Sequence, residues 1–257
     1  MANNNDADDK LQHATLLNGL KRAFTSEEHS DLTIICQDRQ WKAHKFLLCA
    51  QSEWFRKACA GPWKEGKEGT ITLKEDDPQV IDALLHWLYN FEYDEYGLSQ
   101  DHQCPMVLDV RVYAAADKYF VPNLKRLAVE KFEKHTKAGW KSDGFANAIP
   151  EAYVVVPESD RTLKNIIIDV ASAHKAALFH PSKGSEVFKR LTAELPEFGK
   201  DLLVASNITW IEGEWVKYRC PGCGMDWAMP ESKTDFTCPR YCIGKRNPSF
   251  WEAFKQE

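Results

Sequence analysis

The chain has 257 residues, of which 44% are hydrophobic and 28% are charged, and its formal net charge is -5 at pH 7. This length supports one large domain or two small ones with a substantial core, and the composition is typical of a soluble globular protein. The negative charge disfavours a protein built mainly for nucleic acid or for an anionic membrane surface. No apolar run approaches the roughly 20 residues of a membrane span. The polar, acidic N-terminus is not a secretory signal, so we expect a cytoplasmic or nuclear protein with reduced cysteines.

The N-terminal region is predicted to contain a polar tail and an amphipathic helix. Residues 1–10 are rich in Asn and Asp and are expected to form a disordered tail. From Leu11 to Phe24 the apolar residues recur at helical spacing. The face they form contains Leu16, Leu17, Leu20 and Phe24. The spacing leaves open whether this face packs on its own domain or on another molecule.

Residues 30–63 predict a β-hairpin that runs directly into a pair of helices. Apolar residues alternate with others from Leu32 to Cys36, as in a strand with one buried face. The polar residues 37–40 can turn the chain into a second strand. From Lys45 the apolar residues follow helical spacing, and Ser52 is well placed to cap the second helix.

These residues resemble the BTB/POZ domain of the type common in fungal proteins. The matching blocks are Ser30-Asp31-Leu32, His44 to Cys49, Ser52, Phe55, Trp63-Lys64-Glu65, Ile71-Thr72-Leu73 and Val80 to Tyr93. Residues 108–128 resemble the closing helices of the same domain, so the resemblance covers about Leu11 to Lys137. It implies an α+β fold, in which helices wrap a small sheet, and a non-catalytic protein–protein interaction domain.

The resemblance also implies two binding surfaces. In this family the first helix usually forms much of a two-fold dimer interface, which implies homodimerisation through Leu16, Leu17, Leu20 and Phe24. In members that recruit a cullin-type E3 ubiquitin ligase, a bulky apolar residue followed two positions later by Glu contacts the cullin. Trp63 and Glu65 have this spacing, so a substrate adaptor is the more specific function implied. The alternative is that Trp63 folds back onto its own domain.

The family assigns structural roles to Asp31 and His44. We therefore reject a nucleophilic set formed by these two residues and Cys49. The sequence contains no Gly-rich phosphate loop, no His-Glu-x-x-His pattern and no nucleophile elbow. We expect that the protein is not an enzyme.

A second helical region is predicted after the BTB-like residues. Gly139–Gly144 is expected to form a hinge, and four helical patterns follow at 145–155, 161–179, 185–195 and 197–206. Their order resembles the helical extension that follows fungal BTB domains and that corresponds in position to the BACK region. The predicted organisation is a disordered tail (1–10), a BTB/POZ domain (11–137), a BACK-like extension (138–206) and a zinc-binding module (207–257).

Four cysteines near the C-terminus predict a structural zinc site. Two residues lie between Cys220 and Cys223, three lie between Cys238 and Cys242, and fourteen separate the two pairs. Cysteine pairs on tight turns can supply the four tetrahedral ligands that zinc prefers, and a site with four cysteine ligands has no open position for catalysis. Trp215, Trp227 and Phe236 are the expected core of this zinc-ribbon-like module. The alternative is four reduced cysteines in an ordinary loop region.

Nucleic-acid binding by this module is disfavoured by its nearly balanced charge. Lys245 and Arg246, beside Tyr241, form a small basic and aromatic spot rather than a stripe. Direct DNA contact is therefore kept only for an alternative function, a nuclear transcriptional regulator whose BTB domain recruits partners.

Overall fold

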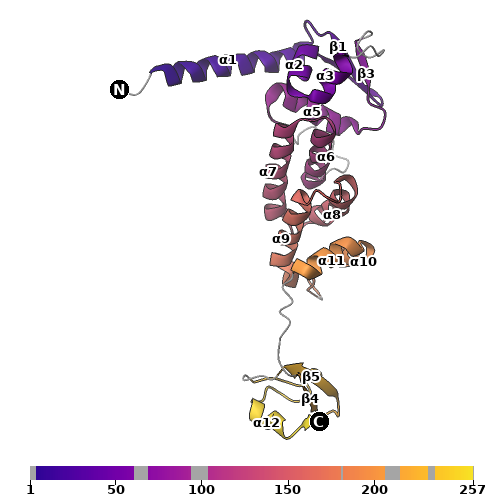
Figure 1. Ribbon diagram of the computed structural model, residues 1–257. Helices are drawn as coiled ribbons and strands as arrows, with labels where there is room; N and C mark the ends of the chain where they lie inside the picture. The colour runs from indigo at the N-terminus through magenta and orange to yellow at the C-terminus, as the bar shows by residue number, and fades with distance from the viewer. Residues whose placement is uncertain are drawn as a thin grey trace. The chain divides into compact units, whose positions relative to one another are not determined.

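The computed structural model describes residues 4–60, 69–93, 104–180, 182–205, 215–230 and 235–256 (Figure 1). The chain divides into two compact units, Met1–Ser206 and Asn207–Glu257. Each unit has its own hydrophobic core, and the two are described separately.

Helix α1 spans Asn4–Ser26 and begins earlier than the predicted helix. The expectation of a disordered tail is therefore wrong for residues 4–10. At the other end of the helix the ring of Phe24 lies 4.9 Å from that of Tyr89 and joins the core.

The first unit contains the predicted hairpin within a three-stranded sheet. Strand β1 (Leu32–Cys36) pairs antiparallel with β2 (Arg39–Ala43) and parallel with β3 (Thr70–Thr72), which gives the order β2-β1-β3. The alternating residues Leu32, Ile34 and Cys36 are buried, so the strand prediction is confirmed.

Helices α2 (Lys45–Gln51) and α3 (Glu53–Ala60) follow the hairpin and are joined at Ser52. The Ser52 hydroxyl accepts a hydrogen bond from the Phe55 amide at 3.1 Å, which confirms the predicted cap. The same hydroxyl donates to the Tyr119 carbonyl at 2.6 Å, and Ser52 is buried. This residue therefore holds the start of α3 against a distant part of the chain.

Three longer helices complete the first half of the unit: α5 (Pro78–Asn90), α6 (Pro105–Lys118) and α7 (Pro122–Gly139). Each begins with proline, which has no amide hydrogen and fits the first helical position. Asp77 caps α5 by accepting a hydrogen bond from the Gln79 amide at 2.8 Å.

The extension consists of α8 (Asp143–Val155), α9 (Thr162–Leu178), α10 (Glu186–Glu194) and α11 (Pro196–Ala205). Its buried residues belong to the same core as those of the preceding helices. A Cβ atom at Gly139 would lie 2.7 Å from the Met106 methyl carbon, and one at Gly144 would overlap the Cys104 side chain. The predicted hinge is therefore wrong, because these glycines permit close packing of the α7–α8 turn.

The second unit is a small sheet with one short helix. Strands β5 (Asp226–Pro230), β4 (Trp215–Arg219) and β6 (Lys255–Gln256) lie in the order β5-β4-β6, and α12 spans Pro248–Glu252. Its fully buried residues are Tyr218, Cys220, Cys238 and Trp251. Half of this set is cysteine, so the apolar core is small.

Both units together give the predicted α+β fold: a small sheet wrapped by helices, a helical extension and a small C-terminal sheet beside four cysteines. Among the helices of the described residues, none is both long and apolar enough to cross a membrane.

Candidate metal centre and interaction surfaces

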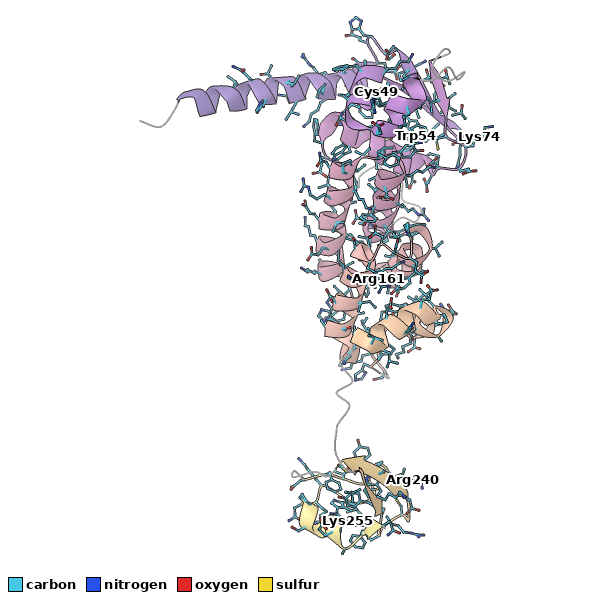
Figure 2. All side chains as sticks on the ribbon, viewed as in Figure 1. Cys49, Trp54, Lys74, Arg161, Arg240 and Lys255 are labelled. Atoms are coloured by element: carbon cyan, nitrogen blue, oxygen red, sulfur yellow. The ribbon has the colours of Figure 1, made fainter. Side chains whose placement is uncertain are left out.

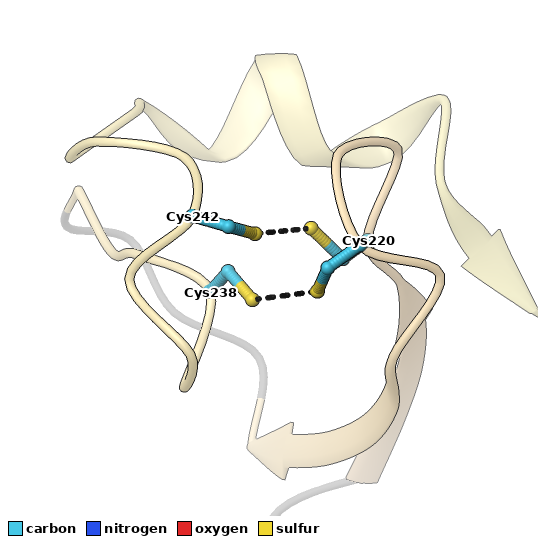
Figure 3. Close-up of side chains that lie close together, drawn as sticks. Cys220, Cys238 and Cys242 are labelled. Atoms are coloured by element: carbon cyan, nitrogen blue, oxygen red, sulfur yellow. Dashed lines mark hydrogen bonds between the residues drawn. The ribbon is translucent and has the colours of Figure 1, made fainter.

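The four predicted ligands converge in the second unit. Their Sγ atoms all lie within 4.8 Å of one another. Cys220 and Cys242 are 3.3 Å apart at sulfur, and Cys223 and Cys238 are 3.7 Å apart, so the two turns face each other (Figure 3). Zinc bound tetrahedrally with Zn–S bonds of about 2.3 Å would separate its sulfurs by about 3.8 Å. The four thiols therefore fit one metal ion of this size.

Backbone hydrogen bonds hold both cysteine turns in place. In the first turn the Gly224 amide donates to the Cys220 carbonyl at 2.8 Å, with Gly224 at a φ of +69°. In the second turn the Tyr241 amide donates to the Cys238 carbonyl at 2.7 Å, with Tyr241 at a φ of +53°. The Arg240 amide also approaches the Cys238 sulfur at 3.4 Å. Amide hydrogens directed at sulfur stabilise the thiolate form that binds metal.

The electrostatics of the cluster favour a thiolate at Cys220. Desolvation by burial raises the pKa of Cys220, but hydrogen bonds from the Cys223 and Gly222 amides and from the Cys242 thiol lower this pKa to about 6. Hydrogen bonding to the Cys220 sulfur in turn raises the pKa of Cys242. A positively charged metal ion would favour the thiolate form of every cysteine that it binds.

Asp31 and His44 lie where β2 meets α2. The Asp31 carboxylate accepts a hydrogen bond from the Lys45 amide at 2.7 Å, at the start of α2. His44 contacts the Tyr89 hydroxyl through Nδ1 and the Glu28 carbonyl through Nε2, both at 2.8 Å. Both imidazole nitrogens therefore have hydrogen-bond partners within the domain, while the Cys49 thiol faces the Phe55 carbonyl at 3.5 Å. Asp31 and His44 therefore make structural hydrogen bonds within the domain. In these contacts His44 is not paired with Cys49 as a base with a nucleophile.

The predicted dimer residues differ in their exposure along α1. Leu16 is 63% exposed and Leu17 is 38% exposed, whereas Leu20 and Phe24 are partly buried. Figure 1 shows the N-terminal part of α1 projecting beyond the rest of its unit. An apolar helix face that is left uncovered is typical of an interface. Trp63 and Glu65, the predicted cullin contacts, lie outside the described residues.

An acidic groove of about 490 Å³ lies beside α6 and α8, and sequence reasoning missed it. Its charged lining consists of Glu75, Asp76, Asp77, Asp117, Glu151 and Asp160 with Arg111 and Lys118. Arg111 joins Asp77 at 3.1 Å and Glu151 at 2.6 Å, so the groove links α5, α6 and α8 by ion pairs. No local pattern could have indicated it, because its residues are spread over a long stretch of sequence.

One carboxylate of this groove is strongly stabilised. Desolvation by burial raises the pKa of Asp160, but hydrogen bonds from the Tyr113 hydroxyl, the Thr162 amide and Lys125 outweigh it. The net effect holds the pKa of Asp160 well below its usual range. The tyrosine and lysine contacts are 2.7 Å and 3.0 Å long. Asp160 therefore fixes the segment before α9 to α6 and α7.

Comparisons with known proteins find similarity in the BTB-like part of the first unit. Residues 20–136 match the BTB/POZ domain family model. The chain is 26% identical over 132 residues to human Kelch-like protein 41, a match that covers 51% of this chain and 20% of that protein. It is 28% identical over 123 residues to Kelch-like protein 40 of Xenopus tropicalis, covering 44% of this chain and 20% of that protein.

Residues 20–136 are therefore similar to the BTB/POZ domain, as the sequence motifs indicated. It spans about a fifth of the length of the Kelch-like relatives that it matches. Among solved structures, the BTB domain of zebrafish PATZ1 matches with 15% identity and a TM-score of 0.37, covering 48% of this chain and 92% of that one. Proteins of the BTB and Kelch-like kind are non-catalytic, in agreement with the expectation that this chain is not an enzyme.

Proposed function

We propose that the protein is a non-catalytic interaction protein that homodimerises through its BTB/POZ domain. The observation that carries the proposal is the exposed part of the apolar face of α1, in which Leu16 and Leu17 are 63% and 38% exposed. Pairing two copies about a two-fold axis would cover this face on both molecules at once. Light scattering of the full chain over a range of concentrations should give the mass of a dimer. A monomer at every concentration would refute the proposal.

The more specific function that we propose is a substrate adaptor for a cullin-type E3 ubiquitin ligase. It is supported by the BTB/POZ match and by the Trp63-Lys64-Glu65 sequence, which has the spacing of the cullin contact. Purified cullin N-terminal domains should bind the full chain, and Trp63→Ala should abolish binding. A matched control is Phe120→Ala, which removes an exposed aromatic ring elsewhere in the domain. Equal loss of binding in both variants would argue against this contact.

For the second unit we propose that the four cysteines bind one structural zinc ion. The support is the match between their sulfur separations and those of a tetrahedral site. Zinc bound there would neutralise thiolate charge and stabilise the small core, since structural zinc contributes directly to folding. Elemental analysis of the purified chain should give one zinc per molecule, and Cys220→Ser should remove it. A full complement of metal in that variant would refute the ligand assignment.

An alternative function is a nuclear regulator in which the second unit contacts DNA and the BTB domain recruits partners. The exposure of Lys245 and Arg246 favours it. Salt-dependent retention on immobilised duplex DNA should then be lost when both residues are replaced by Gln. Absence of any salt-sensitive retention of the parent chain would exclude this alternative.

A further inference from the structure

The second cysteine turn carries an exposed aromatic residue that the turn itself does not require. Tyr241 is 82% exposed, and its φ of +53° lies in the left-handed region. Glycine adopts this region without strain, as Gly224 does just after the first cysteine pair, whereas Tyr241 lies within the second pair, just before Cys242. A tyrosine here strains the backbone and leaves its ring in solvent. Neither packing nor turn geometry therefore accounts for the side chain.

Exposed cations lie on the same turn and just after it. Arg240, Lys245 and Arg246 are exposed, and no acidic side chain of the described residues pairs with them. Elsewhere among the described residues of the unit, Arg219 lies 3.8 Å from Asp226 and Lys255 lies 2.8 Å from Glu252, whereas the exposed Lys217 on β4 has no acidic partner there. Figure 2 labels Arg240 and Lys255 in this unit. Three exposed cations without an acidic partner among the described residues therefore lie within five positions of Tyr241 in the sequence.

The backbone fixes this surface, which we call the Tyr241 patch and define as Arg240, Tyr241, Lys245 and Arg246. Arg246 and Phe236 exchange two backbone hydrogen bonds, each of 2.9 Å, which hold the end of the patch on the core of the unit. The guanidinium carbon of Arg246 lies 5.6 Å from the centre of the Phe250 ring. The cysteine turn holds Arg240 and Tyr241. A preorganised surface of this kind loses little entropy on binding.

We propose that the Tyr241 patch binds single-stranded nucleic acid, with a base stacked on the Tyr241 ring and the three cations contacting phosphates. Stacking on an exposed aromatic ring accepts any base that is free of a duplex, and flanking cations follow the backbone. An acidic peptide would use the same cations but would not need the ring. This inference rests on the nucleic-acid alternative above and makes it specific for single strands.

The test uses the full metal-loaded chain and labelled strands of about 16 nucleotides, the upper range for one small binding domain. Oligo-dT, oligo-U and a duplex of the same length are compared by fluorescence anisotropy as the salt concentration is raised. Both single strands should bind more tightly than the duplex, and the difference between them shows whether DNA or RNA is preferred. Each Gln replacement at Arg240, Lys245 or Arg246 should reduce the salt slope by about 0.7.

Tyr241→Gly is the decisive variant, because it removes the ring while relieving the backbone strain. It should weaken single-strand binding about 5- to 150-fold, as expected for the loss of one stacked base, whereas Tyr241→Phe should retain binding. Phe120→Gly is the matched control, because Phe120 is 59% exposed and has the same φ of 53° in the first unit. Metal content and circular dichroism confirm that each variant is folded.

Three results would overturn the inference. Unchanged binding in Tyr241→Gly would remove the role of the ring. Equal or tighter binding to the duplex would leave the DNA-binding alternative standing while refuting the single-strand preference. The third result is that poly-glutamate binds independently of Tyr241 while neither single strand binds. It would assign the patch to an acidic protein partner. The BTB-mediated dimer is tested separately and is unaffected by any of these outcomes.

Discussion

Replacement of Leu16 by Ala tests the proposed dimer quantitatively. Full burial of a leucine side chain is worth about 1.5–3 kcal/mol. Because Leu16 is 63% exposed in the isolated chain, covering it contributes about 1–2 kcal/mol per molecule. A two-fold interface contains the residue twice, so Leu16→Ala should cost about 2–4 kcal/mol, or about 30- to 700-fold in the dimer dissociation constant. Alanine is the best helix former, so α1 itself is not weakened.

Two further variants make this prediction specific. Leu17 is 38% exposed, so Leu17→Ala should weaken the dimer less, by about 7- to 40-fold. Leu203 lies on α11 and is 58% exposed, and Leu203→Ala should leave the dimer unchanged. Sedimentation equilibrium over a range of concentrations gives the three dissociation constants. If Leu16→Ala and Leu203→Ala weakened association equally, α1 would not be the interface.

Three other predictions concern stability. Chelation of metal, or Cys220→Ala, should unfold the second unit while the first unit keeps its unfolding midpoint, as measured by limited proteolysis and circular dichroism in parallel; joint unfolding would contradict the prediction. Ser52→Ala should cost about 2–4 kcal/mol in urea unfolding, because it removes a cap and leaves a buried carbonyl unpaired, whereas the exposed Ser142→Ala should cost under about 0.5 kcal/mol. The lowered pKa of Asp160 means that its contribution to stability is present at neutral pH and is lost as the pH falls below about 4. Asp160→Asn should therefore flatten the acid side of the pH–stability curve, and an unchanged curve would show that other groups dominate there.

The parts of the fold that were predicted from sequence depend on neighbouring residues. The β1–β2 hairpin follows from apolar residues at every second position of β1, namely Leu32, Ile34 and Cys36, followed by a polar turn. The cap at Ser52 was recognisable because it contacts an amide only three residues away. The hinge prediction was wrong because composition alone shows that glycine permits motion or close packing, and Met106 decides between them from a distant helix.

The candidate sites follow the same rule: a site was predictable where its residues are close in sequence and was missed where they are far apart. The spacing of the four cysteines was sufficient to predict that they converge, because each turn brings two ligands together by itself. The acidic groove joins residues from α5 to the segment before α9, and no short window of sequence contains it. Tyr241 was noticed as an aromatic residue near two cations, but its exposure and strained backbone emerge only from the folded turn.

The two units are stabilised in different ways. This determines whether the α1 face and the Tyr241 patch depend on bound metal. The first unit has one continuous core that includes residues from β1 through α11, so its exposed α1 face rests on a scaffold that needs no metal. In the second unit two of the four fully buried residues are cysteines. Two thiols packed together without a metal contribute little apolar stabilisation, and their thiolates would repel each other. The Tyr241 patch, built on one of the cysteine turns, is therefore expected to depend on metal, whereas association through α1 is not.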